Sequence, residues 1–323
     1  MQLFNAVNCA VATGITGQSH GLTLLPLFHV GGLCVYLSPI LHAGGNNTIM
    51  DQFDAEVMLR LMTDREVGLT HALGVPINFL FISQLPAFAS AKLDHLHSVG
   101  IGAAAPPRSL LEAYAKKGVL FEHAWGMTET ASVGTIIPKH MALQKIGSCG
   151  LPAMHVDLKI VDDAGNDLPP DSVGELLIRR PTVTAGYWQL PEATAAAFLP
   201  GGWFKTGDAA RMDADGYFYI VDRWKDMYIS GGENVYPAEV EDALFRLNGV
   251  TEAAVIGVPD QRWGEVGRAF IVADAEAGLT EARVIAHCRE NLAAYKSPKS
   301  VRFIDELPHN ATGKVTKHLL PRD

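Results

Sequence analysis

The sequence predicts an α/β protein, with a large α/β domain that contains a β-rich subdomain and a small α+β domain at the C-terminus. Apolar residues with helical spacing alternate with short apolar runs that are typical of buried strands. From about residue 156 the pattern changes to alternating strands separated by turns. The last hundred or so residues contain enough predicted elements for a core of their own. We therefore expect two domains, covering residues 1–224 and 225–323.

In the large domain, residues 6–13 are expected to form the end of the first helix, with Gly14 as its C-terminal cap. A second helix follows Asp51, which suits the N-cap position, and shows an apolar residue at every fourth position from Phe53. Further elements are expected as a short strand at 22–27, a helix at 107–117, and strands that include 156–160, 175–178 and 217–221.

The small domain is expected to have the order helix, strand, strand, helix, strand. Its first helix, 237–248, is followed by Gly249, and its second helix begins at a Thr280 cap. The three strands are expected at 253–258, 268–273 and 301–304.

Composition excludes several classes of protein. The net charge is −9, with 26 basic and 35 acidic residues, which argues against nucleic-acid binding as the main function. No apolar run is long enough for a membrane span. The four cysteines are scattered, without the paired spacing of a zinc site or a disulfide framework, so a cytoplasmic location is the expectation.

Four short motifs follow one another along the chain. Trp-Gly-Met-Thr-Glu lies at 125–129, Thr-Gly-Asp at 206–208, Asp-Arg-Trp-Lys-Asp followed by Ser-Gly-Gly-Glu-Asn at 222–234, and Leu-Pro-His-Asn-Ala-Thr-Gly-Lys-Val at 307–315. Each motif alone is weak evidence. Together, in this order, they resemble the adenylate-forming enzymes: acyl-CoA synthetases, aryl-CoA ligases, firefly luciferase and peptide-synthetase adenylation domains.

The resemblance implies an ATP-dependent acid–CoA ligase. Its substrates would be a small carboxylic acid, ATP and coenzyme A, and its products acyl-CoA, AMP and pyrophosphate, with an acyl adenylate as the intermediate and Mg²⁺ as the metal. The attacking carboxylate and the nucleotide are both anionic. Catalysis then requires positioning and neutralisation of charge on the phosphoryl oxygens.

The motif at 125–129 is expected to hold the nucleotide. By the resemblance, Trp125 and Gly126 lie at adenine, Thr128 touches the α-phosphate and Glu129 binds Mg²⁺, a cation that prefers carboxylate oxygen. Trp125 replaces the family's usual tyrosine, which keeps the stacking surface and loses a hydroxyl. Without the other motifs, these five residues could equally be a plain loop after a strand.

Other positions complete the expected nucleotide site. The small residues Gly102, Ala103 and Ala104 resemble the turn that lets the backbone approach adenine. Asp208 resembles the carboxylate that accepts the ribose hydroxyls, and Arg223 would assist there. The alternatives are a tightly packed strand, a turn aspartate and a surface ion pair.

Lys314 matches the lysine that bridges the α-phosphate and the substrate carboxylate, where a mobile point charge is needed. Lys225 matches the hinge position, about which the small domain swings between adenylation and thiolation. We therefore predict catalytic roles for Lys314, Glu129 and Thr128.

The coenzyme A positions are predicted less directly. Gly231 and Gly232 resemble the loop that lines the pantetheine tunnel, while Tyr295 and Lys299 resemble the segment that meets the nucleotide of coenzyme A. Both segments could also be ordinary solvated turns. His29 resembles the gate of the acyl tunnel, although a single histidine is more often structural.

One family feature has no match. The phosphate-binding loop rich in serine, threonine and glycine is absent, and the segment 13–21 has its glycine spacing without the proline and lysine. The resemblance therefore indicates a fragment that lacks the N-terminal third of the family fold. We expect impaired activity and, because apolar surface would be uncovered, self-association.

Two alternatives remain open. The chain could be a non-catalytic fragment or pseudo-enzyme that binds AMP, acyl-AMP, coenzyme A or a protein partner. It could also be an adenylation module that loads a carrier protein. The acid is expected to be a fatty acid or an aryl acid, since apolar residues such as Val30, Leu33 and Met127 surround the predicted gate and nucleotide positions.

Overall fold

The structure is a computed structural model that describes residues 1–102, 106–310 and 314–322. The chain divides into two compact units, which are Met1–Thr206 with Arg211–Ile220, and Gly207–Ala210 with Val221–Asp323. We call them unit 1 and unit 2 and describe each by itself. The domain boundary at 224/225 stays a prediction.

Unit 1 is built on a seven-stranded sheet with the order β2-β1-β3-β4-β5-β6-β7. The first five strands in this order run parallel, and β5, β6 and β7 pair antiparallel. The strands are β1 (His20–Thr23), β2 (Asn46–Ile49), β3 (His71–Gly74), β4 (Ser98–Ile101), β5 (Phe121–Trp125), β6 (Thr135–Ile136) and β7 (Leu151–Pro152).

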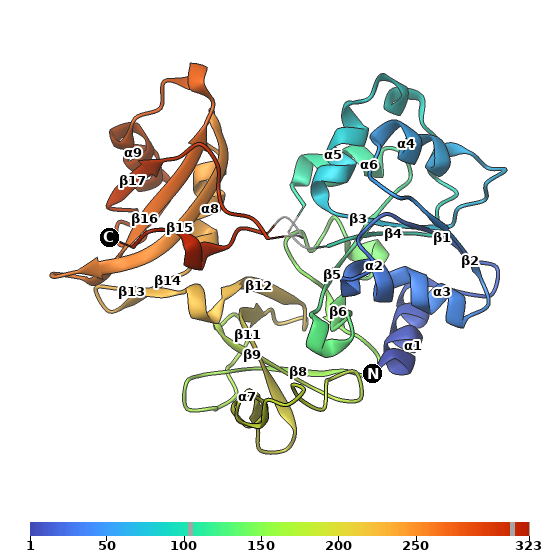
Figure 1. The fold of residues 1–323 in the computed structure, drawn as a ribbon, viewed down its shortest axis with the longest axis horizontal. Coiled ribbons are helices and arrows are strands. Elements are labelled where there is room, and N and C mark those ends of the chain that lie inside the picture. The colour runs from blue at the N-terminus through green and yellow to red at the C-terminus, as the bar shows by residue number, and fades with distance from the viewer. Residues whose placement is uncertain (103–105, 311–313, 323) are drawn as a thin grey trace. The chain divides into compact units, whose positions relative to one another are not determined.

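Helices cover both faces of this sheet (Figure 1). On one face, Met58, Phe79 and Tyr114 join residues of β1, β3, β4 and β5 in a single core; they belong to α4 (Ala55–Thr63), α5 (Pro76–Gln84) and α6 (Arg108–Ala115). On the other face, Cys9, Tyr36 and Ile40 pack with Leu73 of β3. The elements there are α1 (Gln2–Thr13), α2 (Val30–Gly32), the π-helix η1 (Leu33–Leu37) and α3 (Ser38–His42). This arrangement is the expected α/β class.

Two local predictions were wrong in detail. Helix α4 begins after Asp54, whose side chain accepts from the Val57 amide, so Asp54 and not Asp51 is the N-cap. The strand expected at 22–27 is β1 and ends at Thr23. The chain then turns and brings the Leu25 and Pro26 carbonyls tightly against Gly32. A Cβ on Gly32 would lie 2.3 Å from the Leu25 oxygen.

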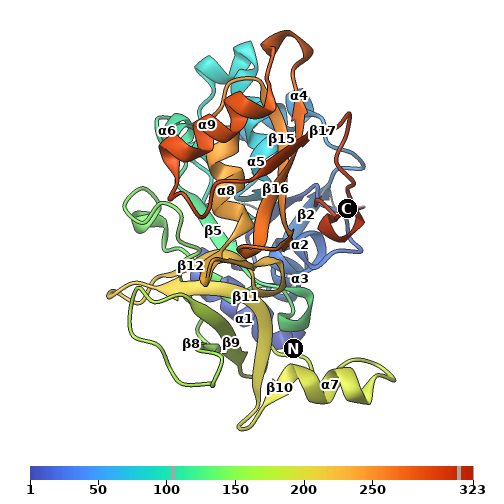
Figure 2. The same cartoon turned by 90° about the vertical axis from the view of Figure 1, so that its left-hand side faces the viewer.

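A second, β-rich sheet follows, with the order β10-β11-β9-β8 and with β12 paired to β11 (Figure 2). Its strands are β8 (Asp157–Val161), β9 (Gly174–Arg179), β10 (Phe198–Leu199), β11 (Trp203–Met212) and β12 (Phe218–Arg223), and α7 (Pro191–Ala197) precedes β10. Strands β11 and β12 run through the unit division.

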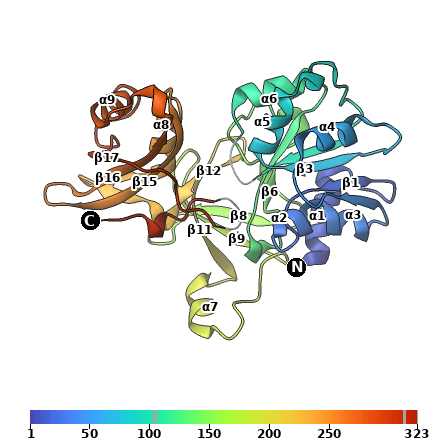
Figure 3. The same cartoon turned by 45° about the horizontal axis from the view of Figure 1, so that its top comes forward.

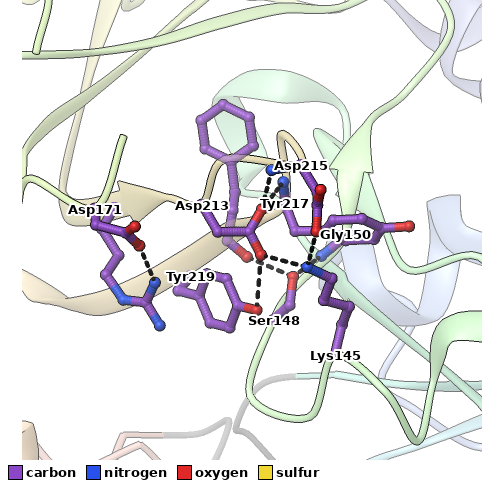
Figure 4. A network of polar contacts seen from close by, with 10 residues as sticks. Lys145, Ser148, Gly150, Asp171, Asp213, Asp215, Tyr217 and Tyr219 are labelled. Atoms are coloured by element: carbon purple, nitrogen blue, oxygen red, sulfur yellow. Dashed lines mark hydrogen bonds and ion pairs between the residues drawn. The ribbon is translucent and has the colours of Figure 1, made fainter. Parts of the chain in front are cut away.

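A polar network in unit 1 holds the turn between β11 and β12 (Figure 4). The Lys145 ammonium donates to Asp213 at 2.8 Å and to Asp215 at 2.6 Å. The Tyr219 hydroxyl also donates to Asp213. Burial alone would raise the pKa of Asp213, but these hydrogen bonds and the lysine charge lower it below its ordinary value. The turn is therefore fixed to the loop that carries Lys145.

Unit 2 contains a five-stranded sheet with the order β14-β13-β16-β15 and with β17 parallel to β16. Helices α8 (Pro237–Phe245) and α9 (Glu281–Asn291) lie on the same face of it (Figure 3). The opposite face packs on Leu307 and Leu320 of the C-terminal segment. The strands are β13 (Tyr228–Ser230), β14 (Glu233–Val235), β15 (Val250–Asp260), β16 (Gly264–Ala273) and β17 (Ser300–Phe303).

The alternation of β15 explains how one strand serves both faces. Ala253 and Val255 belong to the core beneath the helices, whereas Ala254 and Ile256 belong to the core beneath the C-terminal segment. The predicted Thr280 cap is present, since its side chain accepts from the Arg283 amide. The hairpin of β13 and β14 was not predicted.

No helix in the described part of the chain is long and apolar enough to cross a membrane.

Candidate active site

In unit 1, the motif 125–129 forms the connection between β5 and β6. It turns sharply, because the Thr130 hydroxyl accepts a hydrogen bond from the Met127 amide and Ala131 takes a left-handed backbone conformation with φ of 58°. A Cβ on Gly126 would lie 1.3 Å from the Ser132 carbonyl oxygen. Only glycine fits at 126, so this loop conformation depends on that residue.

Glu129 is half-buried in this loop and is held from outside the motif. The Tyr187 hydroxyl donates to its Oε1 at 3.0 Å, and the Thr184 amide donates to its backbone carbonyl at 2.7 Å. Among the described residues, no hydrogen bond to Oε2 is made. One carboxylate oxygen is therefore oriented and the other remains available.

Tyr187 is not among the residues that the sequence predicts for the site. Burial and the hydrogen bond to Glu129 raise the pKa of its hydroxyl, so it acts as a donor. The local signal was a glycine followed by two aromatic residues at 186–188, but nothing local shows that Tyr187 reaches a residue 58 positions away.

The other predicted residues of unit 1 lie on or beside these turns. Thr128 is exposed and Trp125 is half-buried, packed against the core that contains Tyr36. Gly102 follows β4, and a Cβ placed on it would meet no atom within 4 Å. Ala103 and Ala104 lie outside the described residues.

His29 is the N-cap of α2, where its Nδ1 accepts from the Gly31 amide at 3.0 Å. Phe28 beside it is 76% exposed. The histidine therefore has a structural role at the start of the helix, and its role as a gate stays a prediction.

The segment 13–21, which has the glycine spacing of a phosphate loop, uses its amides internally. The Gly14 and Ile15 amides donate to Ala10, and the Thr16 amide donates to the Ser19 hydroxyl. Gly14 is the left-handed C-cap of α1. A phosphate-binding loop presents such amides to its ligand, so this geometry agrees with the absence of a match to that loop.

In unit 2, Asp208 and Arg223 form an ion pair with an N–O distance of 3.1 Å. The Asp208 side chain is only 6% exposed, and that of Arg223 is 45% exposed. The strands β11 and β12 carry the two residues. A guanidinium favours the charged form of a neighbouring carboxylate, and a carboxylate is a good acceptor for hydroxyl donors.

Lys314 lies near this pair. Loss of water around its ammonium group lowers its pKa first, although the residue as a whole is exposed; repulsion by Arg223 lowers it further, and attraction by Asp208 opposes both. All three groups therefore interact electrostatically within unit 2. The motif at 206–208 and the motif at 307–315, about a hundred residues apart in sequence, converge at this point.

The loop that carries Lys314 is closed by Asn310, whose side-chain oxygen accepts a hydrogen bond from the Lys314 amide at 3.0 Å. The Asn310 amide in turn donates to the Lys314 carbonyl. Just beyond, Lys317 pairs with Glu241 of α8 at 2.7 Å, where both side chains are less than a fifth exposed. The hydrogen bonds between Asn310 and Lys314 join the two ends of the loop, and the Lys317–Glu241 pair attaches the segment after it to α8.

The predicted hinge and the predicted coenzyme A residues occupy turns. Lys225 is exposed in the 3-10 turn after β12. Gly231 and Gly232 form the two-residue turn between β13 and β14 with φ of 64° and 90°, the left-handed conformation that such hairpins require. Tyr295 is 36% exposed and Lys299 is exposed, both after α9.

The donor set fits a magnesium ion that is shared with phosphates. No cluster of three or more histidine, cysteine, aspartate or glutamate ligands occurs in the ranges that the structure describes. Mg²⁺ bound with a nucleotide needs only one or two protein carboxylates, because phosphate and water oxygens complete the octahedron. The available Oε2 of Glu129 meets that requirement.

Comparison with known proteins adds two matches to sequence profiles. Residues 2–188 match the profile described as AMP-binding enzyme, and residues 239–314 match the profile described as AMP-binding enzyme C-terminal domain. The first match contains the motif 125–129, and the second ends at Lys314.

Individual curated relatives are named as CoA synthases or CoA ligases. A feruloyl-CoA synthase from Amycolatopsis is 41% identical over 97% of this chain and 63% of its own length. A 2-succinylbenzoate–CoA ligase from Geobacillus kaustophilus is 38% identical over 99% of this chain and 64% of its own. The chain thus spans about three fifths of the length of these curated relatives.

Among solved structures, the O-succinylbenzoate coenzyme A synthetase from Bacillus subtilis in complex with ATP and magnesium ion is similar to this chain, with a TM-score of 0.88. The two are 32% identical, and the match covers 99% of this chain and 65% of that one.

Proposed function

The chain belongs to the AMP-binding enzyme family, and on this basis we propose that it acts as an ATP-dependent acid–CoA ligase. In the first half-reaction, a carboxylate oxygen of the acid attacks the α-phosphorus of ATP and pyrophosphate leaves. In the second, the thiol of coenzyme A attacks the acyl carbonyl carbon, and AMP leaves as the thioester forms. The relatives that are named for CoA ligation support this assignment.

The observation that carries the proposal is the convergence of Asp208, Arg223 and Lys314 in unit 2. Asp208 is assigned to the ribose hydroxyls, with Arg223 beside it. Lys314 is assigned to the α-phosphate and the substrate carboxylate. A cation is needed where two anions must meet, and partial loss of water around the Lys314 ammonium, the first cause that lowers its pKa, would strengthen its electrostatic interactions.

The residues of unit 1 are assigned to the other parts of the nucleotide. Trp125 stacks on adenine beside Gly126, Gly102, Ala103 and Ala104, while Thr128 donates to the α-phosphate. Glu129 holds Mg²⁺ through the oxygen that Tyr187 leaves available. The metal, when bound, neutralises charge on the phosphoryl oxygens.

The thiolation residues are assigned by resemblance, with supporting geometry. Lys225 acts as the hinge, Gly231 and Gly232 line the pantetheine path, and Tyr295 and Lys299 meet the nucleotide of coenzyme A. The exposure of Lys225, Tyr295 and Lys299 leaves them accessible for these roles. His29 gates the acid, which we propose to be a fatty or aryl acid.

Pyrophosphate exchange into ATP across a panel of fatty and aryl acids tests the first half-reaction, and thioester formation with coenzyme A tests the second. We expect acid-dependent exchange and acyl-CoA formation, both slow, because segment 13–21 offers few free amides to the phosphates. AMP binding without exchange would contradict catalysis. Transfer to a carrier protein but not to coenzyme A would favour the adenylation module.

Self-association stays a prediction of the sequence. Large apolar side chains of α1, α3 and β2 are more than half exposed, namely Leu3, Val11, Leu41 and Ile49. Such surface favours association. Light scattering is expected to give a mass above 34.8 kDa, and a monodisperse monomer would contradict the prediction.

A further inference from the structure

A groove in unit 1 lies apart from every residue assigned above. It runs between α4 and the segment 85–92 that follows α5, two neighbouring elements in Figure 1. Its cavity volume is about 720 Å³. Small-molecule sites commonly have volumes of roughly 300 to 1,000 Å³, so the groove is large enough for a small organic ligand.

The floor of the groove is apolar. Leu59 of α4 is 4% exposed and belongs to the main core of unit 1, and Leu85 and Ala91 are half-buried against the same core. The floor is therefore held by the packing of the unit and does not depend on mobile side chains.

The rim of the groove is cationic. Arg60, Arg65 and Lys92 line it, and Glu56 is the only acidic residue among the described residues that do so. Arg65 is paired with Asp94 at 3.1 Å. For Arg60 and Lys92, the described part of the chain provides no ion pair and no side-chain hydrogen bond. This excess of positive charge is local, because the whole chain has a net charge of −9.

We propose that this groove is a binding site for a small anionic amphiphile, a carboxylate with an apolar body. The carboxylate would accept hydrogen bonds from Arg60 and Lys92 at the rim, where charge-assisted bonds are strong. The apolar body would cover Leu59 and Leu85 and release water from them. An apolar floor beneath two unpaired cations is complementary to this class of ligand and not to a cation or a sugar.

The site is independent of the proposed ligase reaction, so it is tested without ATP or coenzyme A. The probe is decanoic acid with a photoreactive diazirine on its chain, followed by peptide mapping. We expect labelling on the peptides that contain residues 56–65 and 85–92. Unlabelled decanoate should compete, whereas decyltrimethylammonium, which has the same chain and the opposite charge, should not.

A charge-reversal variant decides the role of the rim. Arg60→Glu with Lys92→Glu should weaken labelling of these peptides by about tenfold or more. The matched control, Arg246→Glu with Arg289→Glu in unit 2, makes the same change in net charge on exposed residues at the end of α8 and on α9, and should leave the labelling unchanged. Both variants are first compared by thermal unfolding, so that only folded protein is scored.

The proposal is overturned if the label spreads evenly over the surface, if it gathers only on other peptides, or if the groove variant labels as the parent does. Equal competition by decanoate and by decyltrimethylammonium would also overturn it, since the cations would then contribute nothing. None of these outcomes depends on whether the chain forms an acyl adenylate.

Discussion

Two buried carboxylates in this molecule have opposite surroundings. Asp208 in unit 2 is paired with Arg223 and feels the charge of Lys314. Glu122 on β5 of unit 1 is 4% exposed, and its charged form is favoured by a hydrogen bond from the Ser98 hydroxyl and by the charge of Lys139. Burial raises the pKa of Glu122 to about 7.

Burial of an acidic side chain is therefore not by itself a sign of a binding site. A carboxylate that is kept charged by cations can bind hydroxyl groups or cations. A carboxylate with one hydroxyl partner is neutral in mildly acidic solution, and its ionisation destabilises the fold. Function is expected at Asp208 and at the oriented but accessible Glu129, and a cost to stability is expected at Glu122.

Among the carboxylates, the largest effect is expected at Glu129, which has an available oxygen. Glu129→Gln should slow acid-dependent pyrophosphate exchange by about a hundredfold to a thousandfold, because the proposed ligand to Mg²⁺ loses its charge. Glu122→Gln is the matched control, since it makes the same chemical change on the strand that precedes the Glu129 loop and should leave the exchange rate unchanged. Similar losses in both variants would contradict the distinction between the two acids.

The next effect is a pH-dependent gain in stability for Glu122→Gln. The folded pKa of about 7 lies above the ordinary 4.5, so the folded state holds this proton more tightly than the unfolded state does. Stability from this group is complete below pH 4.5 and is lost as the pH rises to 7. The loss amounts to about 3 kcal/mol, from about 1.4 kcal/mol per pKa unit.

Urea unfolding at pH 5 and at pH 8 checks this expectation. Glu122→Gln should be more stable than the parent by up to about 3 kcal/mol at pH 8 and nearly equal to it at pH 5. Burial lowers the pKa of His71 to about 4, which costs stability as the pH falls below 6.5. That contribution is common to both proteins and cancels in the difference. A gain of equal size at both pH values would contradict the titration of Glu122.

A smaller effect is expected at Asp208. Asp208→Asn should weaken AMP binding about tenfold, because an amide accepts ribose hydroxyls less strongly than a carboxylate. It should also lower the pKa of Lys314 further, since Asp208 is the group that raises it. Calorimetric titration with AMP measures the first, and the pH profile of pyrophosphate exchange measures the second. An unchanged affinity for AMP would remove Asp208 from the ribose site.

The smallest effect is expected at Tyr187, which orients Glu129 without a predicted contact to substrate. Tyr187→Phe keeps the ring and removes the hydroxyl donor, so exchange should fall about tenfold or less, and the apparent affinity for Mg²⁺ should fall with it. If excess Mg²⁺ does not restore any of the lost rate, Tyr187 is not an orienting residue for the metal ligand.

The sequence predicted features that depend on near neighbours. The caps at Gly14 and Thr280 follow from backbone preferences that act over a few residues. The fold class followed from periodicity, and the family from the order of the motifs.

Features that depend on distant contacts were not predicted. Asp51 and Asp54 are equally good N-caps as residue types, and only the packing of α4 decides which one receives the Val57 amide. The hairpin of β13 and β14 is short, and one of its strands is completed by β16, far along the chain. Tyr187 reaches Glu129 across 58 positions, and no local pattern encodes that distance.

The two half-reactions, measured separately in a Lys314→Ala variant, decide whether Lys314 is the adenylation lysine. We expect pyrophosphate exchange to fall by about a thousandfold, while conversion of synthetic acyl adenylate and coenzyme A to acyl-CoA proceeds at the parent's rate. Lys299→Ala should show the reverse pattern. Exchange by Lys314→Ala at the parent's rate would contradict the claim that this lysine brings the charge required for adenylation.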